Sequence, residues 1–183
     1  MIENDDAAFS IATLAGGCFW CLEAVYESVS GVKSVISGYM GGSLPNPDYA
    51  AVCTGTTGYA EVVRIHYDPA VIAYAQLLEI FFTIHDPTTP DRQGNDRGSQ
   101  YRSAIFYHDA EQLAIAKKVI AYVQTTLNDA VVTEVTPAMT FYPAEAEHRH
   151  YFGRHPDQAY CFHVIRPKLL KFRQHFPEWQ RKI

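Results

Sequence analysis

The order of the apolar segments constrains the fold of this chain more than any other sequence feature. Apolar runs with strand-like or helix-like spacing occupy residues 9–17, 18–31, 32–39, 59–67, 70–85 and 101–108. The second and fifth runs have the spacing of helices and the others that of strands. This order is typical of a ferredoxin-like split β-α-β core, in which helices cover a mainly antiparallel sheet. We therefore predict an α/β (α+β) fold, a two-layer sandwich.

Further segments follow the core or interrupt it. A helix over 110–128 and a strand over 130–137 come next, and a basic helix begins near Pro167. Two loops, at about 40–58 and 86–100, are long for a compact domain. Long ordered loops tend to carry function, so we expect functional residues in both.

Aspartate residues precede two of the predicted helices. Asp68, with Pro69 after it, and Asp109 are of a residue type that accepts hydrogen bonds from the first turn of a helix. We expect them to be the N-caps of the helices over 70–85 and 110–128.

Length and composition indicate one globular domain. The 183 residues are 48% hydrophobic and 13% aromatic, which suffices for a buried core without disulfides. We predict a single domain over residues 1–183 with its core at about 9–175. The net charge of −5 argues against nucleic acid or an anionic membrane as the main partner.

The N-terminal stretch MIENDDAAFS lacks the basic and apolar regions of a secretion signal. No apolar run approaches the ~20 residues that span a bilayer. We therefore expect a cytoplasmic protein with no membrane partner. In that reducing compartment, four cysteines indicate catalytic, redox or metal-binding use more than structural disulfides.

The stretch AGGCFWCLEAVY, residues 15–26, places Cys18 where the first strand ends and the first helix begins. The free N–H groups and the dipole of a helix N-terminus favour an anion and lower the pKa of a thiol. We therefore expect Cys18 to be an activated thiolate. The rings of Phe19 and Trp20 would form an apolar pocket for a thioether-like group, although Phe19 fits a core position equally well.

Cys21 gives a CxxC spacing with Cys18, which is the geometry of dithiol redox motifs. The two residues are one helical turn apart, so a disulfide between them would carry some strain. A zinc site that adds Cys53 and Cys161 is a weaker interpretation, because these two cysteines are isolated in the sequence.

Three histidines lie in the segment EHRHYFGRH: His148, His150 and His155. Their spacings of two and five do not place all three on one helix face. We predict a solvated segment rather than a metal site.

Four polar residues in or beside the loops are candidates for proton transfer or substrate binding. Glu61 lies two positions before an apolar residue of its strand and should share the inward face, where burial raises the pKa of a carboxyl and suits it to act as a general acid. A surface glutamate fits the pattern equally well. Asp96, Tyr49 and Tyr101 fit turn or packing roles on the pattern alone.

Four segments, in order, resemble the A-type peptide methionine sulfoxide reductases. GGCFWCLE is similar to the family motif G-C-F-W, and NPDYAAVCTGTTGYAEVV to N-P-x-Y-x-x-V-C-x-G-x-T-G-H-A-E. HDPTTPDRQGNDRGSQYRSAIFY resembles H-D-P-T-x-x-x-R-Q-G-N-D-x-G-x-Q-Y-R-S, and FYPAEAEHRHYF resembles F-x-x-A-E-x-x-H-Q-x-Y. The resemblance covers about residues 9–175 and implies one catalytic domain of two α/β layers.

The resemblance implies a role for each candidate residue. Cys18 matches the nucleophile, and Phe19 and Trp20 match the residues that hold the ε-methyl group of the substrate. Glu61 matches the buried acid. Tyr49 and Tyr101 match the two hydroxyls that bind the sulfoxide oxygen. Asp96 matches the polar loop residue that lines the site.

The implied reaction is reduction of methionine S-sulfoxide, in proteins or free, to methionine. Attack by Cys18, with a proton from Glu61, would leave a cysteine sulfenic acid that a second thiol converts to an intramolecular disulfide. Thioredoxin, or dithiothreitol in vitro, would reduce that disulfide by exchange, and neither a cofactor nor a metal is implied.

The chain departs from the family pattern in two places. Tyr59 stands where the family commonly has His, and we expect an altered but functional pocket because Glu61 remains. The chain ends in FPEWQRKI, without the glycine-rich tail that carries the resolving cysteine in many members. Cys161 is our first candidate for that role and Cys21 the second, while Cys53 is expected to be structural.

Two other functions would use Cys18 and Cys21 without sulfoxide reduction. One is a non-catalytic thiol redox sensor or metal-binding module. The other is a thiol–disulfide oxidoreductase, which is disfavoured because no thioredoxin-like strand order follows the motif. Methionine released from its S-sulfoxide would separate them, since a sensor oxidises its cysteines without forming methionine.

Overall fold

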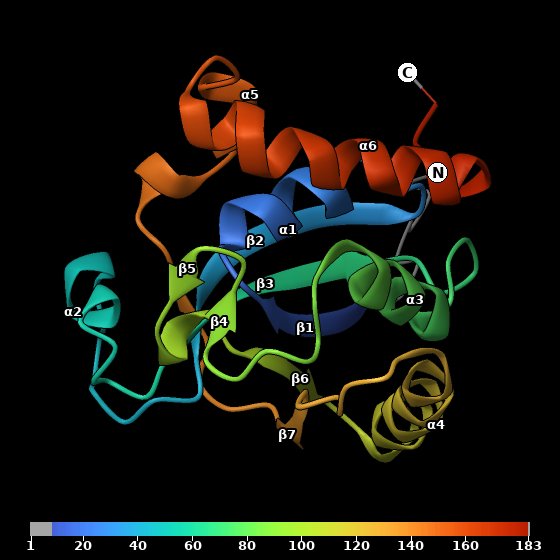
Figure 1. Ribbon diagram of the computed structural model, residues 1–183, viewed down its shortest axis with the longest axis horizontal. Coiled ribbons are helices and arrows are strands. Elements are labelled where there is room, and N and C mark those ends of the chain that lie inside the picture. The colour runs from blue at the N-terminus through green and yellow to red at the C-terminus, as the bar shows by residue number, and fades with distance from the viewer. Residues whose placement is uncertain (1–8, 183) are drawn as a thin grey trace, which may run out of the picture.

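A central sheet with helices packed on one face forms the body of the molecule (Figure 1). The computed structural model describes residues 9–182. Its strands are β1 (Ser10–Gly16), β2 (Val32–Met40), β3 (Ala60–Tyr67), β4 (Arg92–Gln93), β5 (Asp96–Arg97), β6 (Ser103–Tyr107), β7 (Glu134–Pro137) and β8 (Tyr142–Pro143). Its helices are α1 (Phe19–Tyr26), α2 (Tyr49–Cys53), α3 (Tyr74–Ile84), α4 (Ala110–Thr126), α5 (Tyr151–Arg154) and α6 (Arg166–His175).

The sheet has the strand order β7-β6-β1-β3-β2-β8. β1 is antiparallel to both β3 and β6, and β3 is antiparallel to β2. The four inner strands therefore have the order of a split β-α-β core, and the predicted fold class is confirmed. β7 extends the sheet in parallel with β6, which makes the sheet mixed.

The core lies between the sheet and the helices. Alternate residues of each strand point to this side, so that Leu14 of β1 and Val63 of β3, which are cross-strand partners, are both fully buried in it. Phe81 of α3 and Phe172 of α6 pack into the same cluster. The opposite face carries a smaller cluster that includes Met40 and Phe106. A polar side chain on the inward face of β3 therefore points towards the helices.

Two helices begin or end differently from the prediction. α1 ends at Tyr26, and turns carry the chain on to Gly31, whose positive φ of 84° suits glycine. α3 begins at Tyr74, so the predicted cap at Asp68 is wrong. Asp68 instead closes a separate turn, accepting the N–H of Ala70 on its side chain at 2.9 Å.

The predicted cap at Asp109 is confirmed, because its side chain accepts the N–H of Gln112 at 2.8 Å. The long loops carry short elements of their own. The first contains α2, and the second contains the β4–β5 pair and a 3-10 helix at Ser99–Tyr101. None of the helices formed by residues 9–182 combines the length and the apolar composition needed to cross a membrane.

Candidate active site

The start of α1 brings together two residues that are far apart in the sequence. Cys18 is the N-cap of α1 and is 7% exposed. The N–H of Phe19, the first residue of the helix, donates to Glu61 Oε2 at 2.9 Å. Glu61 reaches this position because it lies on the inward side of β3, opposite Tyr39 of β2. A carboxyl therefore occupies the anion position that the helix N-terminus provides.

Glu61 has the surroundings expected of a general acid. It is 1% exposed, and burial raises the pKa of its carboxyl to about 8, even though the Phe19 N–H acts in the opposite direction. The carboxyl therefore keeps its proton at neutral pH. The prediction of an inward-facing acid is confirmed, and the alternative of a surface glutamate is wrong.

The surroundings of the cysteine pair favour ionisation of Cys21 over ionisation of Cys18. Burial raises the pKa of the Cys18 thiol well above its ordinary value, and its hydrogen bond to Cys21 and the charge of Glu61 raise it further. That same hydrogen bond from Cys18 lowers the pKa of Cys21 to about 7. Burial therefore opposes the activated thiolate that we expected at Cys18. Glu61 takes the first N–H of the helix, and burial outweighs the helix dipole.

The rings of Phe19 and Trp20, which follow Cys18 at the start of α1, belong to an aromatic cluster. The ring of Phe19 is fully buried and lies 6.3 Å from that of Trp20 and 6.5 Å from that of Tyr49. Trp20 stays partly exposed, and its indole stacks on Tyr151 at 3.7 Å. Phe19 therefore has the core position that the pattern allowed, while Trp20 lies at the partly exposed edge of the cluster.

The structure brings Tyr49, Tyr101 and Asp96 to the same place from three segments. Tyr49 opens α2, Tyr101 ends the 3-10 helix, and Asp96 lies in β5. Burial raises the pKa of both tyrosines, and the nearby charge of Glu61 contributes in each case. Both hydroxyls therefore remain protonated donors at neutral pH.

His148 is a site residue that sequence reasoning missed. It is 4% exposed, so the prediction of a solvated segment is wrong for this residue, whereas the side chain of His150 is largely exposed. His148 Nδ1 accepts the indole N–H of Trp20 at 3.2 Å, and its ring lies 4.5 Å from that of Tyr49. The available signal was the A-E-x-x-H pattern of the resembling segment, which contains His148.

Glu145 belongs to the same pattern and fixes the wall of the site. Its carboxylate accepts the hydroxyl of Tyr39 at 2.9 Å and the N–H of Tyr49 at 2.7 Å. These two bonds hold the start of α2, and with it the Tyr49 ring, against the sheet.

Tyr160 was also missed, because nothing in the sequence separates it from the other tyrosines. Its hydroxyl donates to Asp96 Oδ2 at 2.6 Å and lies 3.8 Å from Cys21 Sγ. Its ring meets Trp20 edge to face at 5.9 Å. Tyr160 therefore closes the site on the side of Cys21.

The other two cysteines differ in position. Cys161 is fully buried at the start of a π-helical segment, Cys161–Ile165, that continues into α6. Burial raises the pKa of Cys161, and the charge of Cys21 adds to this effect. Cys53 is exposed beside Tyr49, so the expectation that it is a packing residue is wrong.

Tyr59 does not point into the pocket. It is buried, and its hydroxyl donates to the carbonyl of Leu44 at 2.6 Å. A Cβ on Gly42 would lie 2.3 Å from the Tyr59 ring, so the ring fills the space over that glycine. Tyr59 therefore holds the loop that precedes α2, and Glu61 lies two residues further on, within β3.

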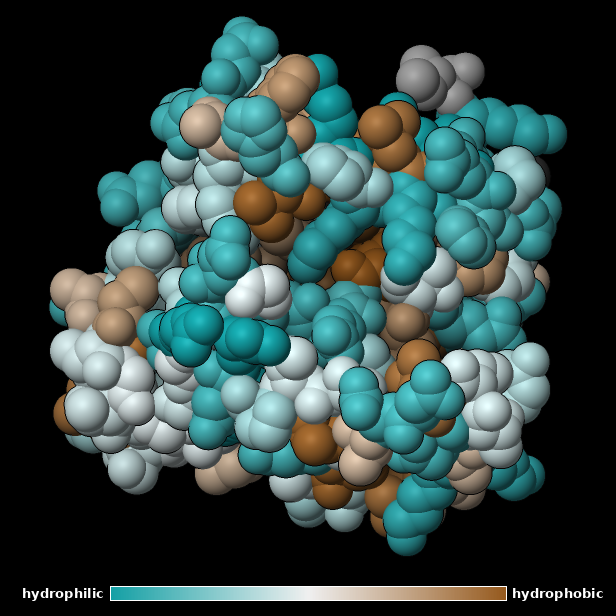
Figure 2. Space-filling model, viewed as in Figure 1, coloured by the Kyte–Doolittle hydropathy of each residue, from teal (hydrophilic) through white to brown (hydrophobic). Residues whose placement is uncertain are grey.

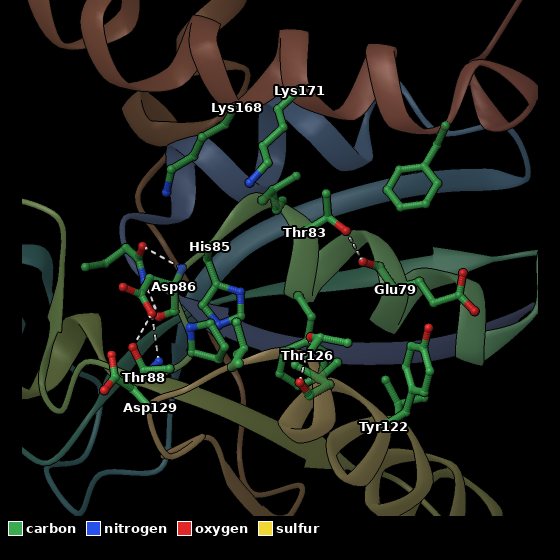
Figure 3. Close-up of a pocket in the computed structure, with 18 of the residues that line it drawn as sticks. Glu79, Thr83, His85, Asp86, Thr88, Tyr122, Thr126, Asp129, Lys168 and Lys171 are labelled. Carbon is green, nitrogen blue, oxygen red and sulfur yellow. Dashed lines mark hydrogen bonds between the residues drawn. The ribbon is translucent and has the colours of Figure 1, made fainter.

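A groove of about 1060 Å³ lies between α3, α4 and α6, away from the cysteines (Figure 3). Lys168 and Lys171 project into it from α6, and Asp86 and Thr88 lie on the opposite wall. On this face hydrophilic residues predominate, and hydrophobic residues show in a hollow beneath α6 (Figure 2). The groove approaches the site through Lys168, whose charge helps to lower the pKa of Cys21.

Within residues 9–182, side chains close enough to share a metal ion are Glu23, Glu27 and His150. This group lies along α1 and at the start of α5 and contains neither Cys18 nor Cys21.

A family model described as peptide methionine sulfoxide reductase matches residues 10–180. The chain belongs to this family. Two curated relatives, both named peptide methionine sulfoxide reductase MsrA, come from Polynucleobacter asymbioticus and Sulfolobus acidocaldarius. Each is 56% identical, the alignments covering 90% and 92% of this chain and 88% and 96% of the relatives.

Solved structures of the family have the same fold. Reduced Mxr1 from Saccharomyces cerevisiae is 35% identical, with a TM-score of 0.79 over 86% of this chain and 92% of that one. Mxr1 has also been solved in complex with Trx2, and that structure is 28% identical to this chain, with a TM-score of 0.56 over 82% of this chain and 90% of that one.

Proposed function

We propose that this chain reduces methionine S-sulfoxide, in proteins or free, to methionine, with Cys18 as nucleophile and Glu61 as acid. The observation that carries this proposal is the protonated carboxyl of Glu61 at the helix start beside the Cys18 thiol. Family membership supports the reaction, and the chain would act as one catalytic domain over residues 1–183 with its core at about 9–175.

The substrate would lie among the rings with its sulfoxide oxygen towards the hydroxyls. Phe19 and Trp20 would hold the ε-methyl group by apolar contact. Tyr49 and Tyr101 would donate hydrogen bonds to the oxygen as negative charge develops there. Asp96, on the β5 side, would line the polar end of the pocket.

The first step begins with the proton of Cys18. This proton passes to the neighbouring Cys21 thiolate, and the Cys18 sulfur attacks the sulfur of the sulfoxide. Glu61 gives its proton to the sulfoxide oxygen, which ends as a hydroxyl group on Cys18. Methionine sulfur is reduced by two electrons and Cys18 is oxidised by two, to a sulfenic acid. Cys21 is then a thiol and Glu61 a carboxylate, so protons and charge balance.

Recycling would use Cys21 directly. Its sulfur attacks Cys18, an S–S bond replaces the S–O bond, and water leaves. Support comes from the N-cap and third-residue positions of the pair on α1 and from the effect of each thiol on the pKa of the other. The charge of Cys21 raises the pKa of Cys161, so these two cysteines are near each other. Cys161 is not among the groups that shift the pKa of Cys18.

Cysteine variants are expected to separate the two candidates for recycling. Cys21→Ser should release about one methionine per enzyme with thioredoxin and then stall, whereas Cys161→Ser should keep turning over. Methionine is measured by chromatography, and the disulfide of the oxidised enzyme is mapped by mass spectrometry. A stalled Cys161→Ser variant with a Cys18–Cys161 disulfide in the wild type would assign the role to Cys161 instead.

Thioredoxin would be the reductant of the resulting disulfide, by thiol–disulfide exchange. The solved complex of Mxr1 with Trx2 supports this partnership. All electrons pass through cysteine sulfur, so the reaction needs no further cofactor. A reducing cytoplasm, where thioredoxin keeps thiols reduced, suits this chemistry.

A further inference from the structure

The proton of Cys21 poses a chemical problem for recycling. This inference rests on the proposed function, in which Cys21 becomes a thiol when Cys18 is oxidised. The largest factor that lowers the pKa of Cys21 is the neighbouring Cys18 S–H, and oxidation replaces that S–H by an S–OH group whose oxygen, as the leaving group, points away from the attacking Cys21. Burial, which raises the pKa, remains because Cys21 is 1% exposed. Cys21 therefore needs a base at the moment when it must attack.

The hydrogen bonds of Tyr160 place a base within reach. Its hydroxyl proton is committed to Asp96 Oδ2 at 2.6 Å, so an oxygen lone pair is left for the Cys21 S–H at 3.8 Å. Edge contact with Trp20 fixes the ring, and the π-helical segment that follows fixes its backbone. Asp96, at the far end of this hydrogen-bonded series, is only partly buried and therefore has access to water.

We propose that Tyr160 relays the Cys21 proton to Asp96 while the disulfide forms. The Cys21 proton moves to the phenol oxygen as the phenol proton moves to the Asp96 carboxylate. The Cys21 sulfur attacks Cys18, the S–S bond forms, and the S–O bond breaks with loss of hydroxide. The Asp96 proton, released to water, neutralises that hydroxide. Tyr160 ends unchanged, having taken one proton from Cys21 and given one to Asp96.

Other groups also face Cys21, and each has a different effect. The titratable and charged side chains around it are Cys18, Glu61, Asp96, Tyr160, Cys161 and Lys168. Lys168 stabilises the thiolate by its charge but cannot remove a proton while protonated itself. Glu61 has just given its proton to the substrate and lies on the side of Phe19. Tyr160 is the neighbour that contacts both the Cys21 sulfur and a carboxylate.

The test is a single turnover of the full-length Tyr160→Phe enzyme, first reduced and then freed of reductant. Methionine S-sulfoxide is added, and samples are quenched over time from pH 6 to pH 10. Methionine reports the first step, a 1,3-diketone traps sulfenic acid, and mass spectrometry quantifies the Cys18–Cys21 disulfide. We expect disulfide formation at neutral pH to slow by on the order of 10²-fold relative to methionine release, with sulfenic acid accumulating.

The pH profile distinguishes a relay from mere packing. The rate in Tyr160→Phe should recover at alkaline pH, where Cys21 ionises without help, whereas a packing defect would slow the step equally at every pH. Tyr151→Phe is the matched control, because it keeps the ring stacked on Trp20 and removes a hydroxyl that donates to Gln158.

Each outcome supports or overturns the relay. Wild-type disulfide kinetics in Tyr160→Phe, a uniform slowing across pH, or a disulfide that excludes Cys21 would overturn it. Absence of methionine from the wild-type enzyme would overturn the proposed function itself. The two failures are therefore distinguishable in one experiment.

Discussion

Cys18→Ser is expected to release no methionine from its S-sulfoxide, whether thioredoxin or dithiothreitol supplies the electrons. A serine hydroxyl is a much weaker nucleophile at neutral pH and cannot be oxidised to a sulfenic acid. Without that intermediate, no group accepts the sulfoxide oxygen or supplies the two electrons that reduce the methionine sulfur. Chromatography of methionine after incubation with free or peptide-bound S-sulfoxide measures the effect.

The control for this loss is Cys53→Ser. Cys53 is exposed and lies beside the pocket rather than at the helix start, so its replacement should leave turnover within about twofold. Circular dichroism should show both variants folded, because serine is close to cysteine in size. Methionine produced by Cys18→Ser at a measurable fraction of the wild-type rate would remove Cys18 from the nucleophile role. A sensor would instead show cysteine oxidation in the wild type with no methionine at all.

The fold could be predicted because each of its elements has a local cause. Segment order alone predicted the inner strands, and the pairing of β1 with β3 and β6 follows from the split β-α-β arrangement. The start of α3 could not be predicted in this way. Asp68 is a good N-cap by residue type, but the two N–H groups of Val71 and Ile72 bond to its carbonyl and close a turn before the helix starts.

The residues of the site were easier to predict from the sequence than their ionisation states. Alternation in β3 indicated that Glu61 points inward, and the position of Cys18 at the helix start was evident from the glycines before it. The location of the resting charge depends on burial and on which group takes the Phe19 N–H, and both are tertiary properties. A strand 42 residues away supplies that acceptor, so the helix-dipole argument for Cys18 failed.

Residues that act through long-range contacts were missed for a similar reason. His148 and Tyr160 both reach Trp20 from more than a hundred residues away. Residue spacing does not show that either side chain is buried, although His148 lies in the A-E-x-x-H pattern of the resembling segment. Only the folded chain shows that His148 holds the indole and that Tyr160 joins Cys21 to Asp96.

Glu61→Gln is expected to slow sulfoxide reduction by about 10²–10⁴-fold at neutral pH while the protein stays folded. Glutamine keeps an oxygen that can accept the Phe19 N–H but has no acidic proton for the sulfoxide oxygen. The rate of the first step is measured by rapid quench with methionine S-sulfoxide in excess. Tyr59→Phe is the control, because it removes a hydroxyl bonded to Leu44, just before β3, without altering an acid.

The pH profile adds a second readout of the same group. In the wild type the rate should fall as pH rises through about 8, where Glu61 loses its proton, and as pH drops below about 7, where Cys21 gains one. Glu61→Gln should lose the alkaline limb and keep the acid limb. An alkaline limb near pH 8 that persists in the variant, or a rate equal to the wild type, would remove Glu61 from the role of acid.

Glu61→Gln, which is expected to lose activity, should at the same time gain stability against unfolding. The carboxyl of Glu61 has an ordinary pKa of 4.5 and a folded pKa of about 8, so the folded state binds its proton more tightly than the unfolded state does. Its contribution to the free energy of unfolding is therefore fully present below about pH 4.5 and is lost as pH rises to about 8. Glutamine does not titrate, so Glu61→Gln should gain stability relative to the wild type between pH 5 and pH 8 in urea unfolding. A stability difference independent of pH would mean that Glu61 is already ionised in the folded protein. The enzyme thus holds its acid protonated at a cost in stability that grows over the same pH range in which the acid is needed.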